Sequence, residues 1–370
     1  MRRNLPIAIK VLLAAAVLLA ACSRADAGPP ETMTTTPTLT TRSPTSSTTT
    51  TSTTTTIATP TPVAAPMPAE ARRGRLVIHA VGDTDFTLPS TARALAAEGY
   101  DHPWTGLRGI FQRDHLTIVN LECVPSEIGY PIPKEWNLLC PLEALDAMRR
   151  AGVDAANMAN NHAGDMGKDA LVDGRTNLLQ RGFVTMGAGA DLAEANQPAI
   201  VEVQGWTIGL VGMSSISGNG PWFAREGYPG VAPASVDNAA VAIAAAGEMA
   251  DIVIVMVHWG TDYALGPTGQ DRALARTMID AGADAIVGHH SHRLQPLEVI
   301  DGVPVFWSMG NFIWPDLGRL SSTTGVAEIV VEPDGTITGR IIPAYIESHG
   351  RPVLKGSPDP SLLTDRSAIE

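Results

Sequence analysis

Polar side chains that can bind a metal ion or move a proton follow a series of short apolar runs in this sequence. They are Asp83 and Asp85, Asn120 and Glu122, Asn160, Asn161 and His162, His258, His289, His290 and His292, and Asn311. In an open α/β sheet, sites form beyond the carboxyl ends of the strands, so parallel pairing would bring these groups to one edge. So many carboxylates and imidazoles in one crevice would be hard to desolvate unless cations compensate. Nitrogen and oxygen ligands suit one or two divalent ions of Mn, Fe or Zn.

Each of these residues also has a simpler interpretation. An Asp that follows a strand is often a turn residue or a helix N-cap, which applies to Asp83 and Asp85 taken singly. A lone His258 is more often a partly buried histidine with a hydrogen-bond partner than a ligand. The segment Gly288–His292 is harder to explain in this way, because it holds three imidazoles, two of them in H-x-H spacing. The conjunction of all these residues predicts the metal centre.

The elements that must position these groups are short β-branched runs that alternate with Ala- and Leu-rich helical stretches from about Arg75 onward. The expected strands are Leu76–Gly82, Leu116–Leu121, Ala155–Ala159, Val184–Gly187, Asp251–Val257 and Ala285–Gly288. The expected helices are Leu142–Ala151, Lys168–Arg181, Val236–Ala250 and Gly269–Ala281. Turn signals at Gln204-Gly205, Asp301-Gly302 and Glu332–Gly335 add hairpins. The alternation predicts an α/β fold with largely parallel, buried strands and some antiparallel pairing.

Six short segments carry most of the polar residues in a fixed order. They are Val81–Asp83, Asn120–Cys123, Ala159–His162 with Asp165 and Gly167, His258–Gly260, Gly288–Pro296 and Ser308–Phe312. In order and spacing they resemble the CapA family of poly-γ-glutamate capsule biosynthesis proteins, which is related to calcineurin-like metallophosphoesterases. The resemblance covers about Leu76 to Ile313. It implies a two-sheet β-sandwich flanked by helices, with a metal site on one edge.

The resemblance also implies roles for single residues. The phosphoesterase pattern D-x-H falls on Asp83-Thr84-Asp85, with Asp where His is expected, and Glu122 replaces a metal-bridging Asp. The expected ligands are Asp83, Asp85, Glu122, Asn161, His258, His290 and His292. His162 matches the histidine that polarises a phosphoryl oxygen, and we expect it to act as an acid or oxyanion stabiliser. Because the two replacements alter metal spacing and charge, phosphatase activity does not follow from the resemblance.

Three functions fit such a site. The first is a CapA-type protein that serves the biosynthesis, export or tethering of a poly-γ-glutamate-type polymer, together with its synthesis machinery. The second is an envelope metal-dependent phosphoesterase unrelated to polyglutamate, and the third is a non-catalytic scaffold with a structural metal. Lys134, Arg293 and Asn311 are the expected contacts to an anionic polymer or phosphoester, although Lys134 fits a solvated loop equally well. The formal net charge of −12 argues against nucleic acid as a partner.

The N-terminus predicts export and a lipid anchor. Basic residues flank an apolar run of signal-peptide length that ends in Leu19-Ala20-Ala21-Cys22, which resembles the bacterial lipobox. We expect a signal peptide over 1–21, lipidation at Cys22 and a disordered Thr-, Ser- and Pro-rich tether over 22–72. An ordinary secretory signal or an uncleaved anchor are the alternatives. The folded domain should span 73–348, with a tail over 349–370, and should stand on the extracytoplasmic face of the cell membrane.

Cys123 and Cys140 are the remaining cysteines. Because an exported domain faces an oxidising exterior, we expect them to form a disulfide that closes a Pro-containing loop. A loop of this size adds about 3 kcal/mol to stability in the chain-entropy model. Two small buried thiols are the alternative.

Overall fold

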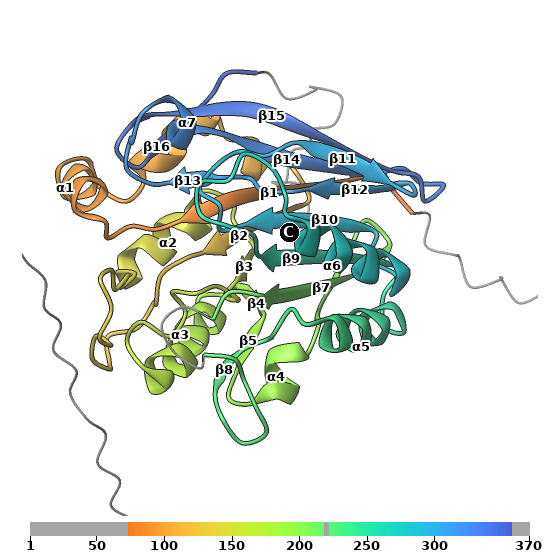
Figure 1. Ribbon diagram of the computed structural model, residues 1–370. Helices are drawn as coiled ribbons and strands as arrows, with labels where there is room; N and C mark the ends of the chain where they lie inside the picture. Colours follow the sequence, from red (N-terminus) through yellow and green to blue (C-terminus); the bar gives the residue numbers. More distant parts are fainter. Residues whose placement is uncertain (1–72, 218–221, 357–370) are drawn as a thin grey trace, which may run out of the picture. The chain divides into compact units, whose positions relative to one another are not determined.

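The β-branched runs form two β-sheets in the computed structural model, which describes residues 73–217 and 222–356 (Figure 1). The first sheet has the order β16-β15-β14-β1-β2-β3-β4, with β13 pairing with β1, and the second has the order β11-β12-β10-β9-β7-β6. The first comprises β1 (Leu76–Thr84), β2 (Leu116–Leu121), β3 (Ala155–Asn157), β4 (Val184–Met186), β13 (Asn311–Ile313), β14 (Thr323–Val331), β15 (Ile337–Ser348) and β16 (Arg351–Leu354). The second comprises β6 (Ala199–Val203), β7 (Trp206–Ser214), β9 (Ile252–His258), β10 (Ala285–His289), β11 (Leu297–Ile300) and β12 (Val303–Phe306). A small separate sheet pairs β5 (Ala188–Gly189) with β8 (Gly230–Val231).

The strands run as their sequences predict. The four strands β1 to β4 are parallel, and so are β7, β9, β10 and β12, which places their carboxyl ends at a common edge of each sheet. The expected hairpins are present: Gln204-Gly205 joins β6 to β7, and Asp301-Gly302 joins β11 to β12. A third turn joins β14 to β15, where the Gly335 amide donates to the Glu332 carbonyl at 2.8 Å. The mixed, largely parallel α/β fold is therefore confirmed.

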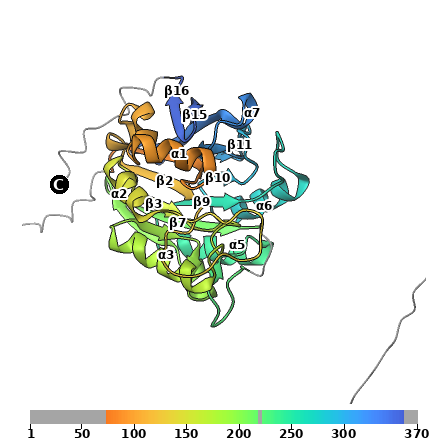
Figure 2. The same ribbon diagram turned by 90° about the vertical axis from the view of Figure 1, so that its left-hand side faces the viewer.

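Helices cover the outer faces of both sheets. The helices are α1 (Pro89–Glu98), α2 (Leu142–Arg150), α3 (Lys168–Gln180), α4 (Leu192–Asn196), α5 (Val236–Gly247), α6 (Gly269–Asp280) and α7 (Arg319–Ser322). Buried residues of α2 and α3 pack into a core on the outer face of the first sheet, and those of α5 and α6 into a core on the outer face of the second. Figure 2 shows the side of the molecule on which α1, α2 and α3 lie.

Local sequence explains these helices. In α5 the apolar residues Ala239, Ala242, Ile243 and Ala246 are buried, at the spacing that places side chains on one helix face. Helix α6 begins with a capping box, in which the Thr268 side chain accepts from the Asp271 amide and the Asp271 carboxylate accepts from the Thr268 amide. The structure thus has the expected αββα layers.

A third core lies between the sheets. It joins alternate residues of β1, such as Ile78 and Ala80, to Ile254 and Met256 of β9 and to Val287 of β10. Because β9 is buried along its whole length, its sequence is a continuous apolar run and does not alternate between apolar and polar residues. This core fixes the spacing between the two edges from which the functional residues project.

An irregularity in β1 positions its acidic end. The register of β1 against β2 shifts between Val81 and Asp83, and from there β1 pairs with β13 instead of β14. A side chain at Gly82 would meet the Gly310 carbonyl oxygen at 1.9 Å, so only glycine allows this approach. The result places Asp83 opposite Asn311.

The expected end of the folded domain differs from the structure, and the expected N-terminal segments lie outside the residues that it describes. The main sheet continues past the expected domain end at residue 348, because β16 pairs with β15 and Leu354 is buried. The assignment of a tail over 349–370 therefore begins too early. The expected signal peptide, Cys22 and the tether lie outside the described residues. Across the residues that are described, no helix is long and apolar enough to cross a membrane.

Candidate metal centre

The carboxyl ends of the parallel strands bring two sets of three metal-ligating side chains together. Asp83 lies at the end of β1 and Glu122 directly follows β2, both in the first sheet. His258 ends β9, while His290 and His292 follow β10, both in the second sheet. Ligand atoms of Glu122, His258 and His290 lie within 4.8 Å of one another, and so do those of Asp83, Glu122 and His292. We call these sets the two trios; Glu122 belongs to both.

Glu122 is the residue that most clearly lacks a partner of its own. Its side chain is fully buried, and within the described part of the chain neither carboxylate oxygen has a hydrogen-bond partner. Burial, and then repulsion by Asp83 and Asp85, raises the pKa of Glu122 well above the usual carboxyl value. His258 Nε2 lies 3.5 Å from Glu122 Oε1, but burial favours the uncharged form of that imidazole. A buried carboxylate without a hydrogen bond is costly, and a cation bound by the trios would remove that cost.

Asp83 is held from several sides. The Asn120 side-chain amide donates to its Oδ1 at 2.8 Å, and His292 Nδ1 lies 3.3 Å from its Oδ2. Burial alone would raise the pKa of Asp83, but the hydrogen bond and charge of His292 lower it instead. His292 in turn also contacts Asn311 Oδ1 at 2.7 Å. These contacts orient a carboxylate oxygen toward the shared Glu122.

His258 and His290 are suited to metal binding as neutral imidazoles. Burial, followed by repulsion from His290, lowers the pKa of His258 well below 6.5. Burial also lowers the pKa of His290. Both rings therefore stay uncharged at neutral pH, which a metal ligand requires. In the structure both ring nitrogens of His258 have hydrogen-bond partners, because Nδ1 lies 3.3 Å from Asn120 Nδ2 and Nε2 lies beside Asn161. The expected ligand Asn161 lies beside them, with its Oδ1 2.6 Å from His258 Nε2.

The backbone around His290 is unusual. His290 and His292 have φ of 89° and 52°, a region that residues other than glycine rarely adopt. Such conformations persist where the surrounding structure fixes them, and they cluster at functional sites. The intervening Ser291 is anchored by its hydroxyl to Ser308 at 3.0 Å. His289, by contrast, lies outside both trios, with its Nε2 3.2 Å from the Val81 carbonyl oxygen.

Asp85 does not join either trio, contrary to its expected role as a ligand. Its Oδ2 accepts from the amides of Thr87 and Leu88 at 2.9 and 2.8 Å, and its Oδ1 accepts from the Thr87 hydroxyl at 2.7 Å. Burial raises the pKa of this carboxyl despite these bonds. Asp85 thus fixes the turn that precedes α1, which is the simpler of its two interpretations.

His162 forms a buried acid–base pair that includes a residue without a predicted role. Its Nδ1 lies 2.6 Å from Asp165 Oδ2. Lys134 Nζ also lies 3.2 Å from this Nδ1, so a carboxylate and an ammonium group both hold this edge of the ring. Asp165 follows His162 by three residues, so the signal was present in the sequence, yet only the fold shows the contact.

Lys134 belongs to this cluster and not to a free binding surface. Its ammonium group donates to Asp165 Oδ1 at 2.6 Å and to the Asn161 carbonyl oxygen at 3.0 Å. Only 8% of its side chain is exposed. These contacts hold Lys134 inside the protein, and its expected role as a substrate contact stays a prediction.

The other two expected substrate contacts lie beside the trios. Asn311 is buried between His292 and the Ser321 carbonyl oxygen, to which its amide donates at 3.0 Å. The guanidinium of Arg293 donates to the His292 carbonyl oxygen at 2.9 Å and lies 4.7 Å above the ring of Tyr263. Both residues therefore already have partners that shape the site.

The expected disulfide is not present in the structure. Cys123 and Cys140 are both free and buried. The backbone brings them together, since the Cys140 amide donates to the Val124 carbonyl oxygen at 2.8 Å. Burial, and then a hydrogen bond with Cys140, raises the pKa of the Cys123 thiol well above its usual value. Pairing of these neighbouring thiols stays a prediction.

The fold and the site define an α/β two-sheet sandwich with buried His, Asp and Glu clusters compatible with divalent ions. The chain belongs to the bacterial capsule synthesis protein family PGA_cap, whose family model matches residues 77–316. The expected relation to CapA proteins is therefore confirmed.

Curated relatives support this relation. The chain is similar to the PGA biosynthesis protein CapA of Bacillus subtilis, with 35% identity over 226 residues that cover 60% of this chain and 59% of that protein. It is also similar to the capsule biosynthesis protein CapA of Bacillus anthracis, with 29% identity over 231 residues that cover 61% of this chain and 54% of that protein. The chain thus spans between half and three-fifths of the length of these two relatives.

Solved structures with a related chain trace include the NAD nucleotidase NadN of Haemophilus influenzae. The TM-score is 0.44 at 13% identity, over 76% of this chain and 54% of that chain. A hypothetical protein from Thermus thermophilus gives a TM-score of 0.43 at 17% identity, over 72% of this chain and 99% of that chain.

Proposed function

We propose that this protein uses a two-ion divalent metal centre to bind and cleave an intermediate in the biosynthesis, export or tethering of a poly-γ-glutamate-type envelope polymer. The observation that carries the proposal is the buried Glu122 carboxylate. It belongs to both ligand trios and has no hydrogen-bond partner among the described residues. Membership of the PGA_cap family supplies the polymer class. Because the chain covers only part of its Bacillus relatives, its substrate and partners belong to the proposal.

The donor set fits two divalent ions. Asp83, Glu122 and His292 would hold one ion, while Glu122, His258 and His290, with Asn161 beside them, would hold the other. Mixed nitrogen and oxygen donors match Mn, Fe or Zn. Such ions, when bound, supply Lewis-acid polarisation of a phosphoryl or carbonyl oxygen.

The chain's own acid is His162. Asp165 holds the ring at Nδ1, and His162 lines the cavity beside the trios, so Nε2 can take up the proton of an attacking water and then give that proton to the leaving group. Lys134 contacts the other oxygen of this carboxylate, with its Nζ 2.6 Å from Asp165 Oδ1. His162→Ala should therefore lower turnover by about 100-fold or more while metal content is unchanged.

We also propose that the protein works on the extracytoplasmic face of the membrane, anchored by a lipid on Cys22. The lipobox-like segment Leu19–Cys22 and the following Thr-rich stretch support this location. A tether of roughly 50 residues would allow the folded part to reach about 40 Å from the lipid on average.

A metal-binding experiment tests the proposal with a matched pair of variants. Full-length protein in detergent is stripped with chelator, reloaded with Mn²⁺ and analysed for metal content, and a panel of phosphomonoesters and phosphodiesters is then assayed. His290→Ala should lose bound metal, whereas His289→Ala, whose ring lies outside both trios, should keep most of it. A wild-type protein that holds no metal would contradict the proposal. A protein that holds metal but turns over no ester or polymer intermediate would be a scaffold with a structural metal.

A further inference from the structure

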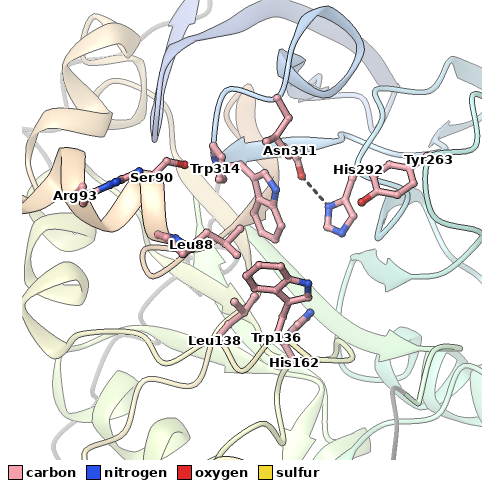
Figure 3. A pocket seen from close by; sticks show the side chains of 13 residues that line it. Leu88, Ser90, Arg93, Trp136, Leu138, His162, Tyr263, His292, Asn311 and Trp314 are labelled. Atoms are coloured by element: carbon pink, nitrogen blue, oxygen red, sulfur yellow. Dashed lines mark hydrogen bonds between the residues drawn. The ribbon is translucent and has the colours of Figure 1, made fainter. Parts of the chain in front are cut away.

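A cavity of about 430 Å³ opens next to the metal centre, within the range of small-molecule sites. His162 and His292 form its inner wall, so a group bound there would adjoin any group held by the trios. The remaining wall comes from the start of α1, the loop between β2 and α2, the loop after β9 and the segment after β13 (Figure 3). We call this space the aromatic cavity, because Trp136, Tyr263 and Trp314 line it.

The aromatic side chains are concentrated here. The chain holds only 7 Trp, 5 Tyr and 6 Phe, yet two Trp and one Tyr face this single cavity. Trp136 and Trp314 point toward one another across it (Figure 3). Trp136 leaves 51% of its surface exposed, which is costly for a large apolar side chain unless a ligand covers it.

The opposite wall is rigid. The Trp314 ring lies 4.7 Å from the His292 ring, and the Tyr263 ring lies 6.1 Å from it. Tyr263 has φ of 62°, and its amide donates to the Ser291 carbonyl oxygen at 2.7 Å. Arg293 packs on the face of the Tyr263 ring. A strained backbone and a stacked guanidinium thus hold an aromatic wall against a metal-ligand candidate.

The charge of the cavity argues against a polyanionic chain as its occupant. Of its thirteen lining residues, Arg93 alone carries a permanent charge, and none is acidic. A polyglutamate segment would bring one carboxylate per residue into this largely apolar space, and most of those charges would stay uncompensated.

We propose that the aromatic cavity binds a planar ring on the alcohol side of a phosphoester whose phosphoryl group lies at the trios. The proposal rests on the proposed function and names the substrate class of that site: a ring-bearing activated intermediate and not the polymer itself. The ring stacks against Trp136, with Trp314 and Tyr263 behind it. The Arg93 guanidinium can bind one further anionic group at the outer end of the cavity.

Non-hydrolysable probes test this. Binding of methylphosphonate, phenylphosphonate and 1-naphthylphosphonate to Mn²⁺-loaded, full-length protein is measured by calorimetry. Wild type should bind the naphthyl probe at least about tenfold more tightly than the methyl probe, since each aromatic stacking contact changes affinity by that order. Trp136→Ala should remove the difference, and Trp136→Phe should restore most of it.

Tyr130→Ala is the matched control, because Tyr130 lies on the same loop, is 87% exposed and does not line the cavity. This variant should bind all probes as wild type does. Equal affinity of wild type for the methyl and naphthyl probes, or an unchanged preference in Trp136→Ala, would overturn the proposal.

Inorganic phosphate separates the two proposals. If phosphate shows no Mn²⁺-dependent binding, the proposed function fails. The cavity is then tested on its own by the quenching of tryptophan fluorescence with 1-naphthol. Wild type should then bind 1-naphthol about tenfold more tightly than Trp136→Ala. Equal binding by the two proteins would overturn the ring site.

Discussion

Replacing Glu122 with Gln should change stability in opposite directions, depending on whether metal is bound. Without metal, the substitution keeps the size of the side chain and removes a buried carboxyl that has no hydrogen-bond partner among the described residues. With metal, the same substitution removes the one group that both trios share. The variant should therefore be more stable than wild type in chelator and should gain little from Mn²⁺.

The pH dependence gives the magnitude. Below pH 4.5, the ordinary pKa of this carboxyl, the group is protonated in folded and unfolded chains alike, so wild type and variant should be equally stable. Burial raises the folded pKa, so that above pH 4.5 only the unfolded chain ionises readily and wild type loses stability relative to the variant. At about 1.36 kcal/mol per pH unit, the interval from 4.5 to pH 7 limits the difference to about 3 kcal/mol. This corresponds to about 6 °C in Tm, at roughly 2 °C per kcal/mol.

Scanning calorimetry between pH 4.5 and 8, in chelator and in Mn²⁺, measures both effects. Wild type should gain about 2.7 kcal/mol at a Mn²⁺ concentration 100 times Kd, and Glu122→Gln should lose most of this gain. Glu328→Gln is the control, because Glu328 is equally buried but contacts His79 and Arg340. It should be less stable than wild type in both conditions. A Glu122→Gln protein that melts below wild type in chelator at pH 7, or keeps the full Mn²⁺ gain, would refute the reasoning.

Three further expectations concern the anchor, the thiols and a buried histidine. Cys22→Ser should abolish membrane retention and lipid labelling; a variant that still carries label would disprove the lipobox. If Cys123 and Cys140 pair in the exported protein, both should resist a thiol reagent in unreduced, denatured protein, and modification of both would exclude the bridge. His79→Gln should lose about 1–3 kcal/mol at pH 6 and less at pH 9, measured by urea unfolding. Burial opposes the proton, but contacts with Asp114 and Glu328 raise the pKa of His79 above 6.5, so its contribution is complete below pH 6.5 and declines as pH rises through the folded value. Equal losses at both pH values would contradict this.

The layers of the fold could be predicted because each buried strand and amphipathic helix has a pattern that is recognisable in its own residues. A strand such as β9, buried on both faces, must be apolar throughout, and the Gly-containing turns mark each hairpin. The short β16 was missed, because its pairing with β15 depends on a distant strand and not on its own four residues. Helix α1 was also missed, since only Thr91 and Leu95 of it are buried.

Residues of the candidate metal centre could be predicted where they end strands, but not where they lie in loops. Residues that end parallel strands, such as Glu122 and His258, follow from topology alone, because every such position reaches the same edge. Asp85 and Lys134 occupy loops, where a side chain can turn toward the site or toward its own backbone. The sequence pattern is the same in both cases, and only the local hydrogen bonds decide. The aromatic cavity could not be predicted, since its walls come from six segments far apart in the chain.

The two trios draw their side chains from both layers of the sandwich: Asp83 and Glu122 from one sheet, and the three histidines from the ends of the other. Any ion bound there would cross-link the two sheets, which must separate when the chain unfolds. Resistance to proteases would then depend more on the rate at which the ion dissociates than on the free energy of unfolding of the metal-free protein. The supply of divalent ions would thus govern how long each molecule survives as well as how fast it works.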